Sequence, residues 1–233
     1  MIKVTDKSKC SGCTACYAAC PHQAISMKPD ALGFLYPEVD MDRCTDCGLC
    51  ERKCDFVNAQ PSSMSLPEKL PVFAARNADP QVLESSQSGG VFPALSKAVI
   101  SAGGVVYGAA FRPDFTVAHM RSADLKGCAA FRGSKYVQSE LYASFEDVKY
   151  ELSEGRQVMF TGTPCQIAGL KSYIGKDEPD LLLVDCACHG VPGPGLWEKY
   201  VKALSDRYSM LIKDVRFRDK DRSWRKYDFV VEG

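Results

Sequence analysis

Residues 10–21 read CSGCTACYAACP, and residues 44–55 read CTDCGLCERKCD. Both stretches carry four cysteines with the spacing C-x2-C-x2-C-x3-C, so the second stretch repeats the first. This spacing is typical of bacterial ferredoxins with two [4Fe–4S] clusters, in which the fourth cysteine of each run ligates the cluster of the other run. The spacing therefore predicts two ligand sets, which are Cys10, Cys13, Cys16 and Cys54 for the first cluster and Cys20, Cys44, Cys47 and Cys50 for the second.

The residues between these cysteines favour the same interpretation. Two residues between ligands make a tight loop that points three sulfurs at three corners of a cube. Small residues such as Gly12 and Gly48 let backbone N–H groups approach the cluster sulfides. The three-residue gap before the fourth cysteine matches one helical turn, and Pro21 ends the first of these turns because it has no N–H.

Disulfides and zinc are the competing interpretations of these cysteines. Disulfides form in oxidising compartments, and the N-terminal MIKVTDKSKC lacks the apolar core of a signal peptide. A zinc site uses four ligands, usually in two pairs, which does not explain two runs of four. The iron–sulfur interpretation accounts for all eight cysteines.

Composition restricts the class of protein. The chain has 233 residues, of which 45% are hydrophobic and 25% are charged, so a second domain with its own core can follow the cysteine-rich part. Formal net charge is zero, which gives no sign of a nucleic-acid-binding surface. No apolar run approaches the roughly 20 residues of a membrane helix. We expect a cytoplasmic protein with no nucleic-acid partner and no membrane segment.

The sequence predicts an α+β ferredoxin-like 2[4Fe–4S] domain at residues 1–58, a linker at 59–70, and an α/β domain at 71–233. In the first domain, residues 2–5 and 24–41 should form short strands and a hairpin around the clusters. The linker AQPSSMSLPEKL is rich in proline and serine and lacks an apolar period. It could be a free tether or a loop folded against the second domain.

Strand and helix patterns alternate through the second domain. Strands are predicted at residues 72–76, 105–111, 115–120, 157–160, 181–186, 212–218 and 226–231, and helices at 90–102, 144–154, 164–173 and 196–207. This alternation predicts a sheet with at least some parallel pairing. The sequence ends at VVEG, inside or just after a strand, so we expect a fragment or a domain completed elsewhere.

Two polar, glycine-containing segments are candidates for a cofactor site. Residues 85–90 read SSQSGG ahead of a predicted helix, where free N–H groups suit a phosphate. Helix capping by Ser88 is the alternative explanation. Residues 132–139 read RGSKYVQS, in which Lys135 could stabilise negative charge on a reduced flavin ring or simply occupy a solvated edge strand.

Two further segments follow predicted buried strands. Residues 161–166 read TGTPCQ, where Thr163 fits a helix N-cap and Cys165 falls in the first helical turn, which stabilises a thiolate. Cys165 could be a nucleophile, a cluster ligand or a buried structural thiol. Residues 185–195 read DCACHGVPGPG and contain Cys188. Because loops at the carboxyl ends of neighbouring strands converge, we expect Cys165 and Cys188 on one side of the domain, facing the cofactor pocket.

Six motifs, in this order, resemble the family of beta subunits of coenzyme F-420-reducing hydrogenases and dehydrogenases: SQSGGVF, GGVVYGAAF, RGSKYVQS, FTGTPCQIAGLK, CHGVPGP and FRDKDRSWRKY. The family also contains relatives that reduce a chlorophyll derivative and bacterial members from polysaccharide gene clusters. The resemblance implies an FAD-binding α/β domain fed by iron–sulfur clusters. Cys128 and Cys186 lie outside these motifs, SWRKY replaces the usual GW with a following Lys or Arg, and the family's longer C-terminal region does not follow.

The resemblance and the loop chemistry together give the predicted site. The residues expected at the flavin are Ser88, Gly89, Gly90, Gly133, Ser134, Lys135, Thr161, Gly162 and Thr163. Lys135 and Cys165 are the predicted catalytic residues. Cys165 and Cys188 are candidate ligands of a further [4Fe–4S] cluster, which the resemblance implies for some members.

The leading functional hypothesis is an oxidoreductase that passes electrons between two [4Fe–4S] clusters and an FAD, which exchanges a hydride with a small-molecule substrate. The alternative is an electron-transfer subunit without its own substrate, for instance in polysaccharide biosynthesis. A third hypothesis is a scaffold that has lost flavin binding. The expected partner is an electron donor or acceptor protein, or a reduced cofactor.

Overall fold

The computed structural model describes residues 1–58, 70–220 and 226–233. The predicted linker at 59–70 lies outside these residues except for Leu70. Within the described parts of the chain, no helix is long and apolar enough to cross a membrane.

Residues 1–58 fold around one hairpin and several single-turn helices. Strands β1 (Ile25–Pro29) and β2 (Leu35–Val39) pair antiparallel, as predicted for residues 24–41. Each cysteine run supplies one short α-helix in its middle, and these two are α1 (Ala15–Ala18) and α2 (Leu49–Arg52). The remaining helices are η1 (Lys7–Lys9) and α3 (Asp55–Asn58).

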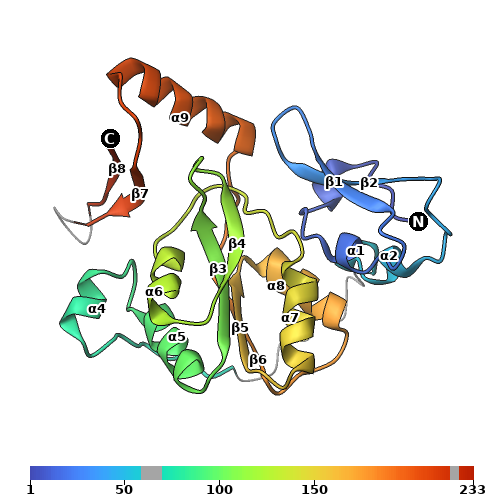
Figure 1. The fold of residues 1–233 in the computed structure, drawn as a ribbon, viewed down its shortest axis with the longest axis horizontal. Coiled ribbons are helices and arrows are strands. Elements are labelled where there is room, and N and C mark those ends of the chain that lie inside the picture. Colours follow the sequence, from blue (N-terminus) through green and yellow to red (C-terminus); the bar gives the residue numbers. More distant parts are fainter. Residues whose placement is uncertain (59–69, 221–225) are drawn as a thin grey trace.

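A four-stranded sheet with the order β4-β3-β5-β6 forms the centre of the second domain (Figure 1). Its strands are β3 (Val105–Phe111), β4 (Val117–Ser122), β5 (Val158–Gly162) and β6 (Leu181–Asp185). Strands β3 and β4 form an antiparallel hairpin, whereas β3, β5 and β6 run parallel. The predicted mixture of a hairpin and parallel pairs is therefore confirmed.

Helices cover both faces of this sheet (Figure 1). Helices α5 (Val91–Ser101) and α6 (Leu125–Cys128) lie on one face, and α7 (Ser144–Ser153) and α8 (Pro164–Ile174) lie on the other. The short helix η2 (Ala129–Phe131) follows α6.

The strand sequences alternate between two cores because successive side chains point to opposite faces. One core contains Tyr107 and Phe160 with side chains of α7 and α8, and the other contains Val106 and Met159 with side chains of α5 and α6. The first of these cores also contains Ala15 of the cysteine-rich domain. The two domains therefore share one hydrophobic core.

The C-terminal part of the chain packs against the end of the sheet where β3 and β4 are joined. Helix α9 (Pro194–Tyr208) precedes a separate antiparallel pair, β7 (Asp214–Asp219) and β8 (Asp228–Glu232). Trp197 of α9 is buried in a cluster with Val117 of β4 and Val215 of β7. Aromatic stacking of Trp197 on Phe111 links this layer to β3.

Two predicted strands are wrong. Residues 72–76 form no strand, and Val72 and Phe73 are 92% and 83% exposed. A helix that was not predicted follows them. It is α4 (Pro80–Glu84), whose N-cap Asp79 accepts hydrogen bonds from two backbone N–H groups. Residues 2–5 form no strand either, because they lie against the cysteine cavities, where Ile2 N–H donates to Cys50 Sγ at 3.2 Å.

Candidate iron–sulfur and cofactor sites

The eight cysteines of the two runs surround two cavities. One cavity is lined by Cys10, Cys13, Cys16 and Cys54. The other, smaller cavity is lined by Cys20, Cys44, Cys47 and Cys50. This is the division expected from the spacing, with the fourth cysteine of each run crossing to the other set. We call the two groups the first and second thiol sets.

The two cysteine loops have the same backbone shape. The residue just before the second cysteine of each run is left-handed, with φ of 67° at Gly12 and 51° at Asp46. The residue directly after the second cysteine is also left-handed, with φ of 63° at Thr14 and 69° at Gly48. Sulfurs also accept backbone N–H groups, as in the 3.3 Å bond from Ala24 to Cys20. Such N–H···S bonds are among the groups that set cluster potentials.

The chemistry and arrangement of the thiol sets fit [4Fe–4S] clusters. Among the described residues, no three His, Cys, Asp or Glu side chains converge as the ligands of a single metal ion do. Burial raises the pKa of the Cys13 thiol to about 11 and raises the pKa of Cys16 further. These groups are therefore protonated at neutral pH unless iron holds them as thiolates. The hydroxyl of Thr14, which lines the first cavity, is buried without a hydrogen-bond partner.

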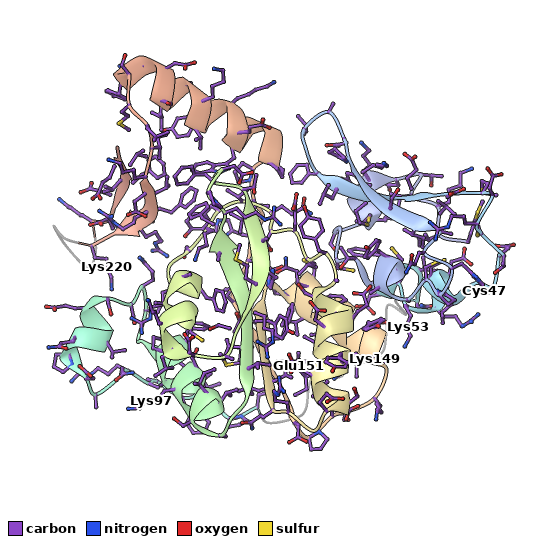
Figure 2. The ribbon with its side chains drawn as sticks, viewed as in Figure 1. Cys47, Lys53, Lys97, Lys149, Glu151 and Lys220 are labelled. Atoms are coloured by element: carbon purple, nitrogen blue, oxygen red, sulfur yellow. The ribbon has the colours of Figure 1, made fainter. Side chains whose placement is uncertain are left out.

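The first thiol set lies against helix α8 of the second domain. A Cβ atom on Gly169 would lie 2.9 Å from both Cβ and Sγ of Cys13, so only glycine allows this approach without a shift. Nearby, Lys53 Nζ donates to the Ser172 carbonyl at 2.7 Å, and Ser172 Oγ donates to the Lys53 carbonyl at 3.0 Å. Figure 2 shows Lys53 beside α7 and α8, whereas Cys47 of the second set lies on the outer side of the molecule.

The segment TGTPCQ has the helix-start geometry that its sequence predicts. Thr163 is the N-cap of α8, Pro164 is its first residue, and Thr163 N–H donates to the Gln166 side chain at 2.9 Å. Cys165 lies in the first turn, with its Sγ 3.1 Å from Thr163 Oγ1. Thr161 links strands β5 and β3, because its hydroxyl donates to the Tyr107 carbonyl at 3.0 Å.

Three further thiols gather at the carboxyl edge of β5 and β6. Gly162 pairs with Asp185 across these parallel strands, and Cys186 N–H donates to the Gly162 carbonyl at 3.1 Å. Burial raises the pKa of Cys186, and its neighbours Cys188 and Cys165 raise it further. The structure thus brings Cys165 and Cys188 to one edge, together with Cys186, which lies outside the recognised motifs. The sequence feature that could have indicated Cys186 as a site residue is its place at the carboxyl end of a predicted strand.

Cys128 is a different case. It is buried in the core on the α5 and α6 face, with Val106 and Met159 as neighbours. It has the character of a structural thiol.

A series of buried side-chain hydrogen bonds lies at the same edge of the sheet. His119 Nε2 lies 2.8 Å from the Thr161 carbonyl, and Ser139 Oγ lies 2.9 Å from His119 Nδ1. Gln166 Nε2 donates to Ser139 Oγ at 2.8 Å, and this links the chain to the start of α8. No sequence signal pointed to His119, because a lone histidine in a strand belongs to no motif.

The SSQSGG segment lines a third cavity, of about 600 Å³, which we call the basic cavity, and the RGSK segment contacts its edge through Arg132. Its lining residues are Glu84, Ser85, Gln87, Arg216, Arg218, Asp219 and Lys220. Arg132 Nη1 donates to Ser85 Oγ at 3.2 Å, and Lys220 Nζ donates to the Ser86 carbonyl. Three of the six motifs therefore contribute to one place, although residues 221–225 of the last motif lie outside the described residues.

The two glycines of SSQSGG have local structural reasons. A Cβ on Gly89 would lie 2.3 Å from the Ala75 carbonyl oxygen, and Gly90 has φ of 67° at the N-cap of α5. The capping role considered for Ser88 is wrong, because Ser88 is exposed and α5 has no side-chain cap. The buried Oε1 of Gln87 has no hydrogen-bond partner.

Lys135 points into its own loop. Its Nζ donates to the carbonyls of Ala130 and Arg132, both at 2.8 Å, and burial lowers the pKa of Lys135 to about 8. Residues 132–139 form no strand, so the edge-strand interpretation is wrong. Gly133 and Ser134 belong to the same loop, where Gly133 has φ of 77°.

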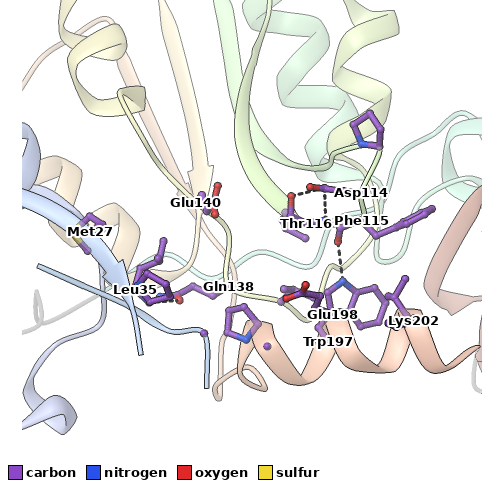
Figure 3. Close-up of a pocket in the computed structure, with 18 of the residues that line it drawn as sticks. Met27, Leu35, Asp114, Phe115, Thr116, Gln138, Glu140, Trp197, Glu198 and Lys202 are labelled. Atoms are coloured by element: carbon purple, nitrogen blue, oxygen red, sulfur yellow. Dashed lines mark hydrogen bonds between the residues drawn. The ribbon is translucent and has the colours of Figure 1, made fainter. Parts of the chain in front are cut away.

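A larger cavity, of about 890 Å³, lies between the two domains (Figure 3). It is lined by Met27 and Leu35 of the hairpin, by residues 137–138 and 140–142, by the β3–β4 turn and by α9. Trp197 Nε1 donates to the Phe115 carbonyl at 2.8 Å and fixes one wall. None of the predicted flavin residues lines this cavity. No local sequence pattern predicts this cavity, because its walls come from segments far apart in the chain.

Known proteins resemble parts of this chain. Residues 9–57 match the 4Fe-4S dicluster domain family. One of the subunits of the F(420)H(2) dehydrogenase of Methanosarcina mazei is 26% identical over 181 residues, which cover 71% of this chain and 49% of that protein. The chain thus spans about half the length of this curated relative. Among solved structures, the F420-reducing [NiFe] hydrogenase complex from Methanosarcina barkeri aligns with a TM-score of 0.46 and 16% identity, over 70% of this chain and 61% of that chain.

Proposed function

We propose that this chain, an F-420 hydrogenase beta-subunit-like protein with a 4Fe-4S dicluster domain, is an iron–sulfur electron-transfer subunit of an oxidoreductase. In this proposal the two thiol sets hold two [4Fe–4S] clusters. The α/β domain holds an FAD that exchanges a hydride with a small-molecule substrate. A bound flavin supplies the conversion between one-electron and two-electron transfer.

The contact between Cys13 and Gly169 is the observation that carries this proposal. It brings the first thiol set into van der Waals contact with α8, the helix that begins at the TGTPC segment. Cys165 lies one helical turn before Gly169, about 6 Å along the helix axis. The first set therefore holds the inner cluster, which exchanges electrons with the α/β domain. The second set, with its exposed Cys47, holds the outer cluster, which exchanges electrons with an external donor or acceptor.

The basic cavity supports flavin binding. Arg216 is ion-paired with Asp214, Asp219 and Glu232, whereas the guanidinium of Arg218, which stacks over Tyr227 at 4.2 Å, suits a diphosphate. The buried Gln87 Oε1 can only accept a hydrogen bond, which suits an imide N–H such as that of a flavin ring. Helix α5 starts after the SSQSGG segment, and its C-terminal end leads into the beginning of β3. The N-terminus of α5 therefore lies towards the carboxyl edge of the sheet, where β5 ends in the TGTPC segment.

An electron-transfer subunit without its own substrate is the second candidate. The favouring observation is that the matched relative is itself named as one subunit of a dehydrogenase and is about twice as long as the part matched here. In that case a partner protein would supply the substrate site. Both candidates use the same two thiol sets.

Cofactor analysis of anaerobically reconstituted protein tests the proposal. We expect about eight iron and eight sulfide per chain, and saturable FAD binding seen as a change in flavin fluorescence. Arg218→Gln should weaken FAD binding and leave the iron content unchanged, whereas Lys97→Ala, on an exposed part of α5, should change neither. Iron content near zero would refute the cluster part. Full iron without FAD binding would leave only the second candidate.

A further inference from the structure

Thr14 occupies a backbone position that suits glycine. It follows the second cysteine of the first run, and its counterpart in the second run is Gly48. Both residues are left-handed, with φ of 63° and 69°. A β-branched side chain is a genuine outlier in this region, since its Cβ crowds the backbone. The internal repeat thus shows that glycine fits the loop, yet the first loop carries threonine.

The hydroxyl of Thr14 is buried and has no protein partner among the described residues. The residue is 4% exposed, and its Oγ1 makes no hydrogen bond to any of them. Leaving a buried hydroxyl unpaired costs about 1–3 kcal/mol. Two unfavourable features, a strained backbone and an unpaired hydroxyl, therefore coincide at one residue.

The surroundings of Thr14 show what the hydroxyl can reach. Thr14 lines the cavity of the first thiol set together with Cys10, Cys13, Cys16 and Cys54. It also lines the cavity between the domains, so it forms part of the wall between the two. The next residue, Ala15, is 1% exposed and belongs to the shared core.

We propose that the Thr14 hydroxyl donates a hydrogen bond to a sulfur of the first cluster and raises its reduction potential relative to the second cluster. This inference rests on the proposed function, because it requires a cluster in the first thiol set. Reduction adds one electron, and thus one negative charge, to a cluster. A hydrogen-bond donor to sulfur stabilises the more negative state, and such bonds are known to set cluster potentials.

The difference between Thr14 and Gly48 predicts a direction of electron transfer. Gly48 has no side chain, so the second loop has no hydroxyl donor at this position. The inner cluster then attracts the electron more strongly than it would with glycine at position 14. This favours transfer from the outer cluster towards the α/β domain.

Potentiometry followed by electron paramagnetic resonance tests the proposal on the full chain. Thr14→Val keeps the shape and removes the hydroxyl, and Thr14→Ser keeps the hydroxyl. We expect Thr14→Val to make reduction of the first cluster about tenfold less favourable, about 59 mV for one electron. Thr14→Ser should stay close to the wild type. The second cluster should not respond in either variant, and Cys13→Ser and Cys47→Ser assign the two signals.

Two controls keep the result interpretable. Thr116→Val makes the same chemical change in the β3–β4 turn, at a residue that lines neither cysteine cavity, and it should shift neither cluster. Thr14→Gly removes the hydroxyl while relieving the backbone, so it replaces Thr14→Val if that variant does not assemble. An unchanged potential in the variant without the hydroxyl, or an equal shift in Thr14→Ser, would overturn the proposal. Wild-type protein that holds no iron would instead refute the proposed function itself.

Discussion

His119 illustrates how a buried side chain can have its protonation state fixed by its neighbours. The Thr161 carbonyl can only accept a hydrogen bond, so His119 carries its proton on Nε2 and Nδ1 accepts from Ser139. The ring stacks on Phe160 with 5.0 Å between centroids. Burial lowers the pKa of His119 to about 4, from an ordinary 6.5. The neutral ring is therefore part of the folded structure.

This lowered pKa predicts a loss of stability in mild acid. The unfolded histidine gains its proton as pH falls through about 6.5, whereas the folded one gains it only near pH 4, so folding becomes less favourable in between. From about pH 7.5 to about pH 5.5 the loss should be about 1 kcal/mol. Denaturant midpoints measured across this range should show it, and His119→Asn should remove it. The same pH dependence in His119→Asn, or its loss in the exposed-residue control His22→Asn, would contradict the assignment.

Helix α8 is an element that joins the two domains, and Gly169 is the residue of α8 that lies against Cys13. Gly169→Val would place side-chain atoms where Cys13 lies, at a cost of about 1–3 kcal/mol for overpacking. The first thiol set should therefore lose its cluster while the second keeps its own. Iron counting and the two paramagnetic signals measure this. Lys171→Ala, at an exposed position of the same helix, is the matched control, and equal loss of both clusters in Gly169→Val would speak against a local effect.

Elements were predictable where local spacing alone determines them. The period of α5, the buried run of β3 and the Thr163–Pro164 start of α8 were all in the sequence. The strand predicted at 72–76 failed because a strand needs a partner, and β-propensity cannot supply one. The basic cavity and the Cys165, Cys186 and Cys188 group depend on which loops become neighbours. The motifs indicated those loops, but the tertiary fold decides their contacts.

At the scale of the whole molecule, the cysteine-rich domain is part of the main core and is not an appended module. Ala15 belongs to the same buried cluster as Tyr107 and Phe145, and the Lys53–Ser172 pair closes the junction. The sequence separates the domains by a proline- and serine-rich stretch and gives no sign of this contact. Docking of this kind could be predicted only from complementary surfaces, which a single sequence does not display.

A shared core predicts that the two domains unfold together. Cluster absorbance near 400 nm and far-ultraviolet circular dichroism should change with one common midpoint in denaturant, because coincident probes are the mark of a cooperative transition. Lys53→Ala should lower both midpoints together. Two separated transitions in the wild-type protein would show that the cysteine-rich domain is an independent unit.

The different depths of the two thiol sets have a consequence for how the protein ages in air. Cys47 is exposed, whereas Cys13 lies behind α8 and next to a shared core. Dioxygen reaches the outer cluster first, so oxidative damage should begin there and leave a chain with one surviving inner cluster. Such a chain would keep its fold and its inner cluster but would have lost the outer one. Exposure to air should therefore remove the outer cluster before the protein unfolds.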